Sequence, residues 1–371
     1  MKIAGIIAEY NPFHNGHKYH IEKTREITGA DGIVAVMSGN FVQRGDAAIC
    51  DKFSRAEMAL NGGADLVVEL PCVFACSSAE IFARGGVGLL ESLGCDCISF
   101  GIEEENIDEL KKVALYLKNS DENFKNRLNS VMKTGKSYPR ALAEVLGTDV
   151  IDTPNNVLAI EYLKALETME PFGIKRSCSM HDGEGSASDI RRKIQLGEDA
   201  THLMPDYSKN ILKSAHRADK RVLESLALYK LRTMSEEELE NVPDVTEGLE
   251  NRIIDAAKKA ESLEELCELI KTKRYTMARI RRIIINSLIG TKKEDVMQKP
   301  QYIRVLGMNK RGMKILSDLR DKTDIPIITK TADAKRCRML ELDIVASDVY
   351  SVLCGERGGA DYLTPPIILN E

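Results

Sequence analysis

The stretch that decides the fold is IAGIIAEYNPFHNGHKYHIEK, residues 3–23. Its first six residues carry no polar side chain, which is typical of a parallel strand buried on both faces. Pro12 and the Asn15–Gly16 pair favour a tight turn, and the residues after it predict a helix over 17–28. A helix that begins directly after such a turn presents backbone N–H groups that bind phosphate. The stretch therefore predicts a phosphate-binding strand–turn–helix unit.

The same alternation of apolar runs and amphipathic segments continues through the first half of the chain. Further strands are predicted over 32–37, 65–70, 97–101 and 173–177, and helices over 54–61, 77–92, 106–118, 122–134 and 156–166. This order indicates a Rossmann-like α/β fold with a parallel sheet covered on both faces. Ligands bind outside the carboxyl ends of such strands. We therefore expect residues 9–17, 38–46, 71–78 and 101–105 to surround one crevice.

From about Met204 the pattern changes to helices separated by acidic loops. Helices are predicted over 209–231, 249–260, 263–270 and 275–288, and strands only over 325–329 and 343–345. The second half is therefore predicted to be mainly helical. For a chain of 371 residues we expect two domains, residues 1–203 and residues 204–371.

The composition favours a soluble globular protein over a membrane protein or a disulfide-rich secreted protein. A hydrophobic content of 43% with 29% charged residues is typical of a soluble globular protein, and no apolar run approaches the ~20 residues of a membrane span. Nine cysteines without a signal peptide argue against a disulfide framework and favour a cytoplasmic protein. The pairs Cys72/Cys76 and Cys95/Cys97 lack the CxxC spacing, so buried thiols are expected there in preference to a metal site.

The histidines of the opening stretch are the first candidate catalytic residues. His14 and His17 flank Gly16, and glycine lets the backbone approach a ligand closely. Both side chains can donate to phosphate oxygens as negative charge builds up at an α-phosphorus. Two alternatives remain, a pair of surface histidines in a loop and a zinc site. The zinc site would use His14, His17 and His20, but no carboxylate or thiolate stands at a suitable spacing.

A second candidate element is SASDIR, residues 186–191, which follows the fifth predicted strand and a glycine-rich turn. Ser186 and Ser188 can cap a helix and can also bond to phosphate. Arg191, one turn later, can reach the β- and γ-phosphates of a departing pyrophosphate. Taken alone, the element is also consistent with an ordinary N-cap followed by a basic helix.

Charge is distributed unequally between the two halves. Residues 1–204 carry 22 Lys and Arg against 30 Asp and Glu, whereas residues 205–371 carry 30 against 27. Residues 271–282 contain six basic residues and no acidic one, and residues 304–338 contain ten basic against four acidic. Such asymmetry points to a polyanionic partner of the second half, with a solvated helix face as the alternative.

These motifs together resemble a known family. The HNGH and Ser-x-Ser-x-x-Arg elements resemble the HxGH nucleotidyltransferase superfamily, whose members attack the α-phosphate of ATP and release pyrophosphate. Longer strings resemble the bacterial tRNA(Met) cytidine acetate ligase (TmcAL) family: AEYNPFHNGH (8–17), MSGNFVQRGDAAICDKFSRAEMAL (37–60), GADLVVELP (63–71), SFGIE (99–103), PNNVLAIEYLKA (154–165) and RYTMARIRRIIINSLIG (274–290). One departure is Ala47–Ala48, where the family pattern has Pro–Ala.

The resemblance implies an adenylate-forming ligase. ATP, with Mg²⁺, and acetate would give acetyl-adenylate and pyrophosphate. The acetyl group would then pass to N4 of the wobble cytidine of elongator tRNA(Met). Residues 1–203 would form the nucleotidyltransferase-like catalytic domain and residues 204–371 the tRNA-binding domain. The resemblance assigns ATP contacts to Ile7, Ala8, Glu9, Tyr10, Asn11, Pro12, Phe13, His14, Asn15, Gly16, His17, Lys18, Tyr19, His20, Gly101, Asn155 and Arg176. Asn156 adjoins Asn155, so the sequence leaves open which of the two faces the nucleotide.

Candidate tRNA-binding residues lie in both halves. Arg44 follows the second predicted strand and is a candidate for binding tRNA or a carboxylate, with a loop-stabilising pair to Asp46 as the alternative. The basic segment adds Lys271, Lys273, Arg274, Tyr275, Arg281 and Arg282. A helix over this segment would bring its charges together, and Tyr275 could stack on an unpaired base. Alternatively, the arginines pair with Glu264, Glu265 and Glu268 and hold helices together.

Two other functions compete with this one. The first is a nucleotidyltransferase or adenylate-forming ligase that acts on a metabolite. The second is a non-catalytic RNA-binding module with a vestigial pocket. The basic segment 271–282 disfavours the metabolic enzyme. The non-catalytic module is disfavoured by the intact set of His14, Gly16, His17, Ser188 and Arg191. The absence of a KMSKS-like string counts against a class I aminoacyl-tRNA synthetase.

Overall fold

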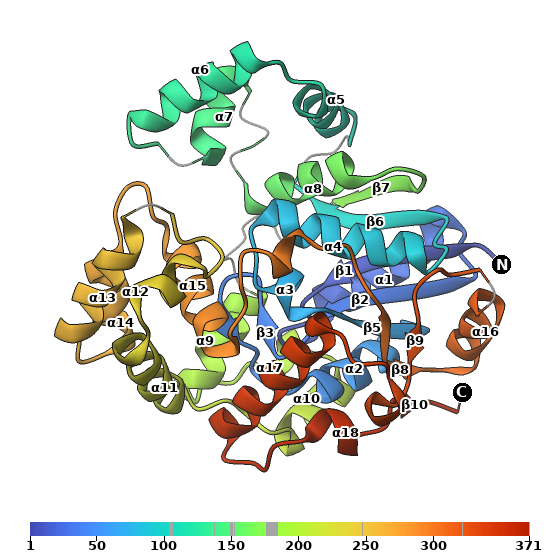
Figure 1. Cartoon of the computed structure of the whole chain (residues 1–371). Helices are drawn as coiled ribbons and strands as arrows, with labels where there is room; N and C mark the ends of the chain where they lie inside the picture. Colours follow the sequence, from blue (N-terminus) through green and yellow to red (C-terminus); the bar gives the residue numbers. More distant parts are fainter. Residues whose placement is uncertain are drawn as a thin grey trace.

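The centre of the protein is a mostly parallel sheet. The computed structural model describes residues 1–103, 107–136, 138–148, 151, 153–175, 185–246, 248–320 and 322–370. Five parallel strands lie in the order β5-β2-β1-β6-β7 (Figure 1). They are β1 (Ile3–Ala8), β2 (Gly32–Ser38), β5 (Leu66–Leu70), β6 (Cys97–Ile102) and β7 (Glu170–Lys175). The predicted parallel α/β fold is thereby confirmed, and residues 176 and 177 of the fifth predicted strand lie outside the described residues.

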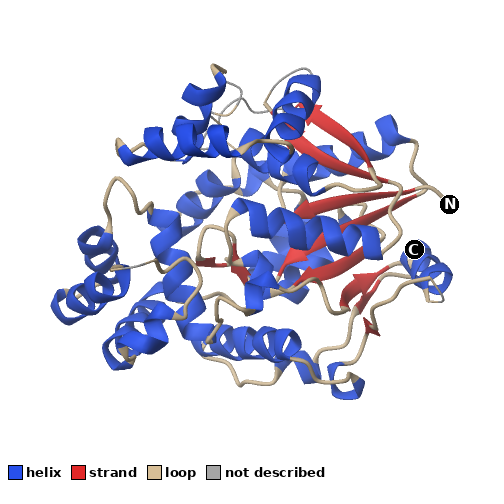
Figure 2. Ribbon diagram, turned by 45° about the horizontal axis from the view of Figure 1, so that its top comes forward, coloured by secondary structure: helices blue, strands red, loops and turns tan. Residues whose placement is uncertain are grey.

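Helices cover both faces of this sheet (Figure 2). Alternate residues of β2 point to opposite faces, so that Ile33 and Ala35 belong to one hydrophobic core and Val34 and Val36 to another. The first core includes side chains of α1 (Asn15–Thr28), α2 (Lys52–Asn61), α9 (Ala187–Leu196) and α10 (Asp206–Ser214). The second includes those of α3 (Cys72–Ala75), α4 (Ala79–Ser92), α8 (Pro154–Ala165) and α17 (Arg338–Cys354). Burial on both sides explains why the strands are apolar throughout.

Two groups of helices lie outside these layers (Figure 1). One group follows β6 and comprises α5 (Ile107–Lys118), α6 (Glu122–Lys133) and α7 (Tyr138–Leu146). The other, which we call the helical cluster, comprises α11 (Lys220–Thr233), α12 (Glu236–Glu240), α13 (Leu249–Lys259), α14 (Leu263–Ile270) and α15 (Met277–Ile289). The helical cluster has a hydrophobic core of its own. None of the described helices is both long and apolar enough to cross a bilayer.

The last part of the chain returns to the central sheet. Strand β8 (Ile303–Met308) pairs antiparallel with β5, and β9 (Ile327–Ile328) and β10 (Ile367–Ile368) pair parallel with β8. Helices α16 (Lys310–Leu319) and α18 (Ala360–Leu363) complete this region. Since these strands follow residue 204 and extend the sheet that precedes it, the division at 203/204 stays a prediction.

Three local predictions were wrong in the second half. Residues 343–345 lie inside the long helix α17, because a short apolar run alone does not distinguish a strand from a buried helix. Strand β8 was not predicted, since Arg304 interrupts its apolar run. The single helix over 209–231 is two helices, and Asp219 caps the second of them.

A fully buried ionic group, which we call the Lys52 cluster, fixes α18 against the sheet. Lys52 Nζ lies 2.7 Å from Glu69 Oε2 and 2.8 Å from Asp361 Oδ1, and Arg304 lies 3.6 Å from the same Asp361 oxygen. Asp343 accepts hydrogen bonds from the hydroxyl of Tyr302 and from the backbone of Cys72. All of these side chains are buried. Burial raises the pKa of Glu69 to about 7. Burial also acts to raise the pKa of Asp361, but Lys52, Ser347 and Arg304 together outweigh it and hold the pKa of that carboxyl below its usual value.

The cysteines behave as the sequence predicts. Cys72, Cys76, Cys95 and Cys97 are buried free thiols. Burial raises the pKa of each of them, which keeps the reactive thiolate form scarce. The expectation of buried thiols at these two pairs is therefore confirmed.

Candidate active site

A cavity of about 620 Å³ opens at the carboxyl ends of β1 and β6. Most residues of the predicted ATP segment line it: Ile7, Ala8, Glu9, Tyr10, Asn11, His14, Asn15, Gly16, His17, Tyr19 and His20. Pro12, Phe13 and Lys18 do not. Phe13 is fully buried and packs beneath His17, with ring centroids 5.6 Å apart, so it supports the histidine from the core. Lys18 points to solvent and pairs with Glu22.

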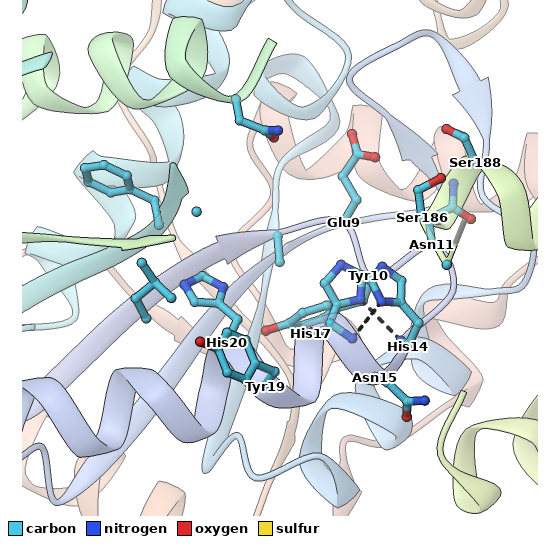
Figure 3. A pocket seen from close by; sticks show the side chains of 18 of the residues that line it. Glu9, Tyr10, Asn11, His14, Asn15, His17, Tyr19, His20, Ser186 and Ser188 are labelled. Carbon is cyan, nitrogen blue, oxygen red and sulfur yellow. Dashed lines mark hydrogen bonds between the residues drawn. The ribbon is translucent and has the colours of Figure 1, made fainter. Parts of the chain in front are cut away.

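The two histidines of the HNGH element form the N-terminal cap of α1 (Figure 3). The backbone N–H of Gly16 donates to His14 Nδ1 at 3.0 Å, and the backbone N–H of His14 donates to His17 Nδ1 at 3.3 Å. Their ring centroids are 3.8 Å apart. Because Nδ1 accepts in both rings, the proton of each neutral imidazole lies on Nε2. The cap thus fixes the orientation and the tautomer of both side chains.

Gly16 is required by the same geometry. A Cβ on Gly16 would lie 2.8 Å from His14 Cε1 and 3.0 Å from Nδ1, so any side chain would displace the capping ring. Tyr10 adds a second support, since its ring lies 5.0 Å from those of Phe13 and His17. The HNGH stretch therefore holds a helix N-terminus and two imidazoles in one fixed arrangement at the cavity.

The second predicted element meets the first across the cavity. Ser186 caps α9 by accepting from the backbone N–H of Asp189 at 3.1 Å. Arg191 donates to the backbone oxygen of Asn11 at 2.6 Å and to Ser188 Oγ at 3.2 Å. Ser186, Ser188 and Arg191 all line the cavity, as the sequence analysis expected. Two helix N-termini, those of α1 and α9, are consequently joined at one site, where their N–H groups favour an anionic ligand.

The other end of the cavity is formed by β6, β7 and α8. Gly101 and Asn155 line it, and Asn155 Nδ2 donates to Glu103 Oε1 at 2.6 Å. Asn156 is fully buried and accepts from the backbone N–H of Glu103, which settles that Asn155 is the one that faces the cavity. Arg176 lies outside the described residues. An apolar lining in this half, which was not predicted from the sequence, is made of Phe100, Leu158, Tyr162 and Ile174.

Arg55 follows the second strand, a position from which the sequence predicts that it faces the crevice, and the structure places it beneath the crevice. Its side chain is fully buried, and its guanidinium donates to backbone oxygens of Cys50, Glu9, Ser38 and Gly39. The oxygens of Glu9 and Ser38 lie at the ends of the neighbouring strands β1 and β2, so Arg55 holds these carboxyl ends in register. No sequence motif marks such a role, because its partners are main-chain atoms.

Arg44 also lines the cavity. It lies at the tip of a hairpin formed by β3 (Phe41–Val42) and β4 (Asp46–Ala47). The structure does not show the alternative, a pair between Arg44 and Asp46. The Asp46 carboxylate instead binds Arg281 of α15 at 3.1 Å. Arg44 is therefore placed at the cavity, and its neighbour connects the hairpin to the helical cluster.

The basic segment 271–282 is not one helix. Thr272 Oγ1 accepts from the backbone N–H groups of Arg274 and Tyr275, which stabilises a loop between α14 and α15. Lys271, Lys273 and Arg274 are exposed, and Lys271 pairs with Glu268 at 3.1 Å. The helix that would have brought the charges of this segment together is thus replaced, over residues 271–274, by an exposed basic loop.

The arginines of α15 are engaged within the protein. Arg282 is only 8% exposed and lies 2.7 Å from Asp244. The partners considered from the sequence were Glu264, Glu265 and Glu268. Tyr275 is flanked by guanidinium groups of Arg274 and Arg279, at 5.7 and 5.1 Å from its ring centroid. Contacts with a large anionic partner are consequently favoured at the exposed loop and disfavoured at Arg282.

Comparison with known proteins agrees with this geometry. Residues 1–360 match the family described as HIGH Nucleotidyl Transferase. The chain is 41% identical to the tRNA(Met) cytidine acetate ligase of Thermoanaerobacter sp. (strain X514), with 100% of both chains covered. It is 40% identical to that of Clostridium perfringens (strain SM101 / Type A), with 99% of this chain and 100% of the other covered.

Solved structures of Thermotoga maritima TmcAL superpose over the whole chain. The form bound with alpha-thio ATP matches with a TM-score of 0.91 and 33% identity, and the apo form with 0.93 and 32%; 100% of each chain is covered. Identity at this level over complete chains, on the same fold, establishes the relationship. This chain belongs to the HIGH nucleotidyl transferase family and, within it, to the tRNA(Met) cytidine acetate ligases.

Proposed function

We propose that the protein activates acetate with ATP and transfers the acetyl group to N4 of the wobble cytidine of elongator tRNA(Met), giving N4-acetylcytidine. The observation that carries this proposal is the meeting of the α1 and α9 N-termini, with His14, His17 and Arg191, at one cavity. That arrangement provides donors for a triphosphate along its whole length. The family relationship supplies the identity of the two other substrates.

In the first step an acetate oxygen attacks the α-phosphorus, and the bond from that phosphorus to the bridging oxygen of pyrophosphate breaks. His14 and His17 donate from Nε2 to the α-phosphate oxygens as their charge increases. Arg191, with Ser186 and Ser188, stabilises the departing pyrophosphate. Since the cap of α1 has already oriented both imidazoles, no reorganisation is required when the charge develops.

The nucleoside end of ATP lies in the apolar half of the cavity. Phe100, Leu158 and Ile174 provide a surface for the base, and Gly101 leaves room beside it. Asn155 is the polar side chain within reach of the nucleoside. Arg176 is proposed to join this set.

Magnesium enters as the ATP complex. Among the described residues that line the cavity, Glu9 is the one carboxylate, and its Oε1 accepts from the backbone N–H of Gln43 at 2.9 Å. A Mg²⁺ ion held chiefly by phosphate oxygens and water fits such a site, since Mg²⁺ in nucleotide enzymes takes few protein ligands. The ion would supply positive charge to the phosphates, and Glu9 is the residue that would hold it.

In the second step the N4 amine attacks the acetyl carbon. A carbon–nitrogen bond forms, the bond from carbon to the AMP oxygen breaks, and one proton leaves the amine. No cysteine lines the described cavity, and Ser186 and Ser188 already bond to Asp189 and Arg191. The acetyl carrier is therefore the bound adenylate, and the protein positions the tRNA amine against it. The exposed loop with Lys271, Lys273 and Arg274 is proposed to bind the tRNA backbone.

Nucleoside mass spectrometry tests the proposal directly. Purified protein is incubated with ATP, acetate and unmodified elongator tRNA(Met), and N4-acetylcytidine is expected only when all three are present. A transcript with uridine at the wobble position is the control. Acetate-dependent pyrophosphate release without any acetylated nucleoside would instead point to a metabolite as the acceptor.

A further inference from the structure

The helical cluster touches the cavity through the β3–β4 hairpin. Arg44 at its tip lines the cavity, and the next two residues contact α15. The backbone N–H of Gly45 donates to Val42 at 2.9 Å and closes the turn. A segment of the catalytic half is thus held by a helix that follows it by more than 200 residues.

Gly45 fixes the hairpin directly on the main chain of α15. Its φ is +75°, and a Cβ there would lie 2.3 Å from the backbone nitrogen of Arg282 and 2.4 Å from the backbone carbon of Arg281. Real Cβ atoms do not approach backbone so closely, and backbone cannot swing aside as a long side chain can. Only glycine therefore permits this contact. The ion pair of Asp46 with Arg281, at 3.1 Å, lies beside it.

The opposite side of the turn is attached to the cavity wall. The backbone N–H of Gln43 donates to Glu9 Oε1 at 2.9 Å, and Gln43 Nε2 donates to the backbone oxygen of Ser77 at 3.2 Å. Asn286 of α15 donates to the backbone oxygen of Cys76 at 3.0 Å, so the helix itself is fixed to the same region. Arg44 lies between two anchored neighbours, which leaves its backbone little freedom.

We propose that α15 positions Arg44 as an anion-binding residue of the acetate-activating step. This inference rests on the proposed function. The Arg44 guanidinium binds a carboxylate or phosphate oxygen of the reactants in the cavity, which are the groups its planar fork matches. Gly45 and Arg281 are positioning residues that act through it. The helical cluster accordingly contributes to a reaction in which tRNA takes no part.

Acetate-dependent exchange between ATP and labelled pyrophosphate, measured without tRNA, tests this role. Gly45→Ala is compared with Gly290→Ala, a matched control at the end of the same helix, whose φ is +82° and where an added Cβ meets nothing within 4 Å. Both variants carry similar backbone strain. We expect Gly45→Ala to lose roughly 10²-fold in exchange rate, because a displacement of about 1 Å can cost that much. Gly290→Ala is expected to stay within a factor of about two.

Two further variants separate positioning from folding and identify the anion. Asp46→Arg and Arg281→Asp should each slow exchange, and the double variant should regain most of the rate, since the pair is restored in reverse. Arg44→Gln should raise the KM for acetate if the guanidinium binds the carboxylate, and the KM for ATP if it binds a phosphate. Either shift supports the proposal, and unchanged KM and kcat values in Arg44→Gln overturn it.

Failure of the two proposals is distinguishable. If the parent protein shows no acetate-dependent exchange, the proposed function and the role of Arg44 both fall. If the parent exchanges and the two glycine variants are equally fast at equal folded fraction, only the positioning role falls. Unchanged exchange in both single variants would likewise assign Asp46 and Arg281 to a purely structural pair.

Discussion

Two groups of polar side chains lie near the carboxyl ends of two strands of the central sheet, β1 and β5, and they do different things. The group at β1, with His14, His17 and Arg191, faces a cavity, and its donors are aimed at the space where a ligand binds. The Lys52 cluster at β5 is fully buried, and its charged groups pair with one another. Burial of charge is therefore no mark of a functional site unless an adjoining cavity leaves the charges something to bind.

The energetic roles of the two groups differ accordingly. Removing water from a charge is expensive, so the Lys52 cluster depends on the presence of every partner. The histidines are held by main-chain N–H groups, and each can lose its side chain without leaving a buried charge behind. Substitutions in the first group should lower the rate, and substitutions in the second should lower the stability.

The largest effect is expected for Lys52→Met, which leaves Glu69 buried without its cation and Asp361 with Arg304 alone. Loss of one partner of a buried pair costs about 3–5 kcal/mol of unfolding free energy. Urea denaturation measures this value. Lys23→Met is the matched control, because Lys23 pairs with Glu26 at 2.6 Å on the exposed face of α1 and should cost less than about 1 kcal/mol. Equal losses in the two variants would contradict the distinction between the two groups.

His17→Ala should lower the rate of ATP–pyrophosphate exchange and leave the free energy of unfolding unchanged. Removal of one preorganised donor to a transition state costs about 10²–10³-fold in rate. The measurement is acetate-dependent ATP–pyrophosphate exchange, with the urea midpoint determined on the same preparation. His216→Ala serves as the control, since His216 lies on the surface beside Glu356. A parental exchange rate in folded His17→Ala protein would remove the HNGH element from the reaction.

A smaller effect is expected when the charge of the exposed loop is reversed. Lys273→Glu with Arg274→Glu should weaken tRNA binding, and each lost phosphate contact should reduce the salt slope by about one. The pyrophosphate exchange rate should remain parental. Reversal of Lys258 and Lys259, which are exposed on α13, is the control of equal charge change. If both double variants weaken binding equally, the contact surface extends over the whole helical cluster.

The smallest change, when it is measured per pH unit, is a pH dependence of stability. Burial raises the pKa of Glu69 from 4.5 to about 7, so the folded state holds this proton more tightly than the unfolded state does. The contribution of Glu69 is present below pH 4.5 and is lost as the pH rises through 7, with a slope of at most about 1.4 kcal/mol per pH unit. Glu69→Gln should flatten the curve of unfolding free energy over this window. An unchanged curve would place the titration on another group of the cluster.

Local patterns predicted most of the sheet and the two phosphate elements. Strands buried on both faces leave apolar runs, and a turn followed by a helix leaves the HNGH signature, so both are visible within about twenty residues. What escaped prediction depends on distant partners. From the sequence alone Arg304 indicates a break in a strand, but in the fold Asp361 compensates its charge. Arg281 likewise indicates a surface charge, but it pairs with Asp46, which lies 235 residues earlier. No periodicity in the sequence encodes such contacts.

The pairing of β5 with β8 determines when the central sheet can be completed during translation. Until residues 303–308 leave the ribosome, one edge of β5 is unpaired. Asp361, the second carboxylate that pairs with Lys52, is synthesised roughly 290 residues after Glu69. At about 5–20 residues per second this interval lasts roughly 15–60 s. The nucleotide-binding half therefore cannot complete its sheet until most of the chain has been synthesised. A product truncated at residue 203 has an unpaired edge at β5, and its Lys52–Glu69 pair lacks Asp361.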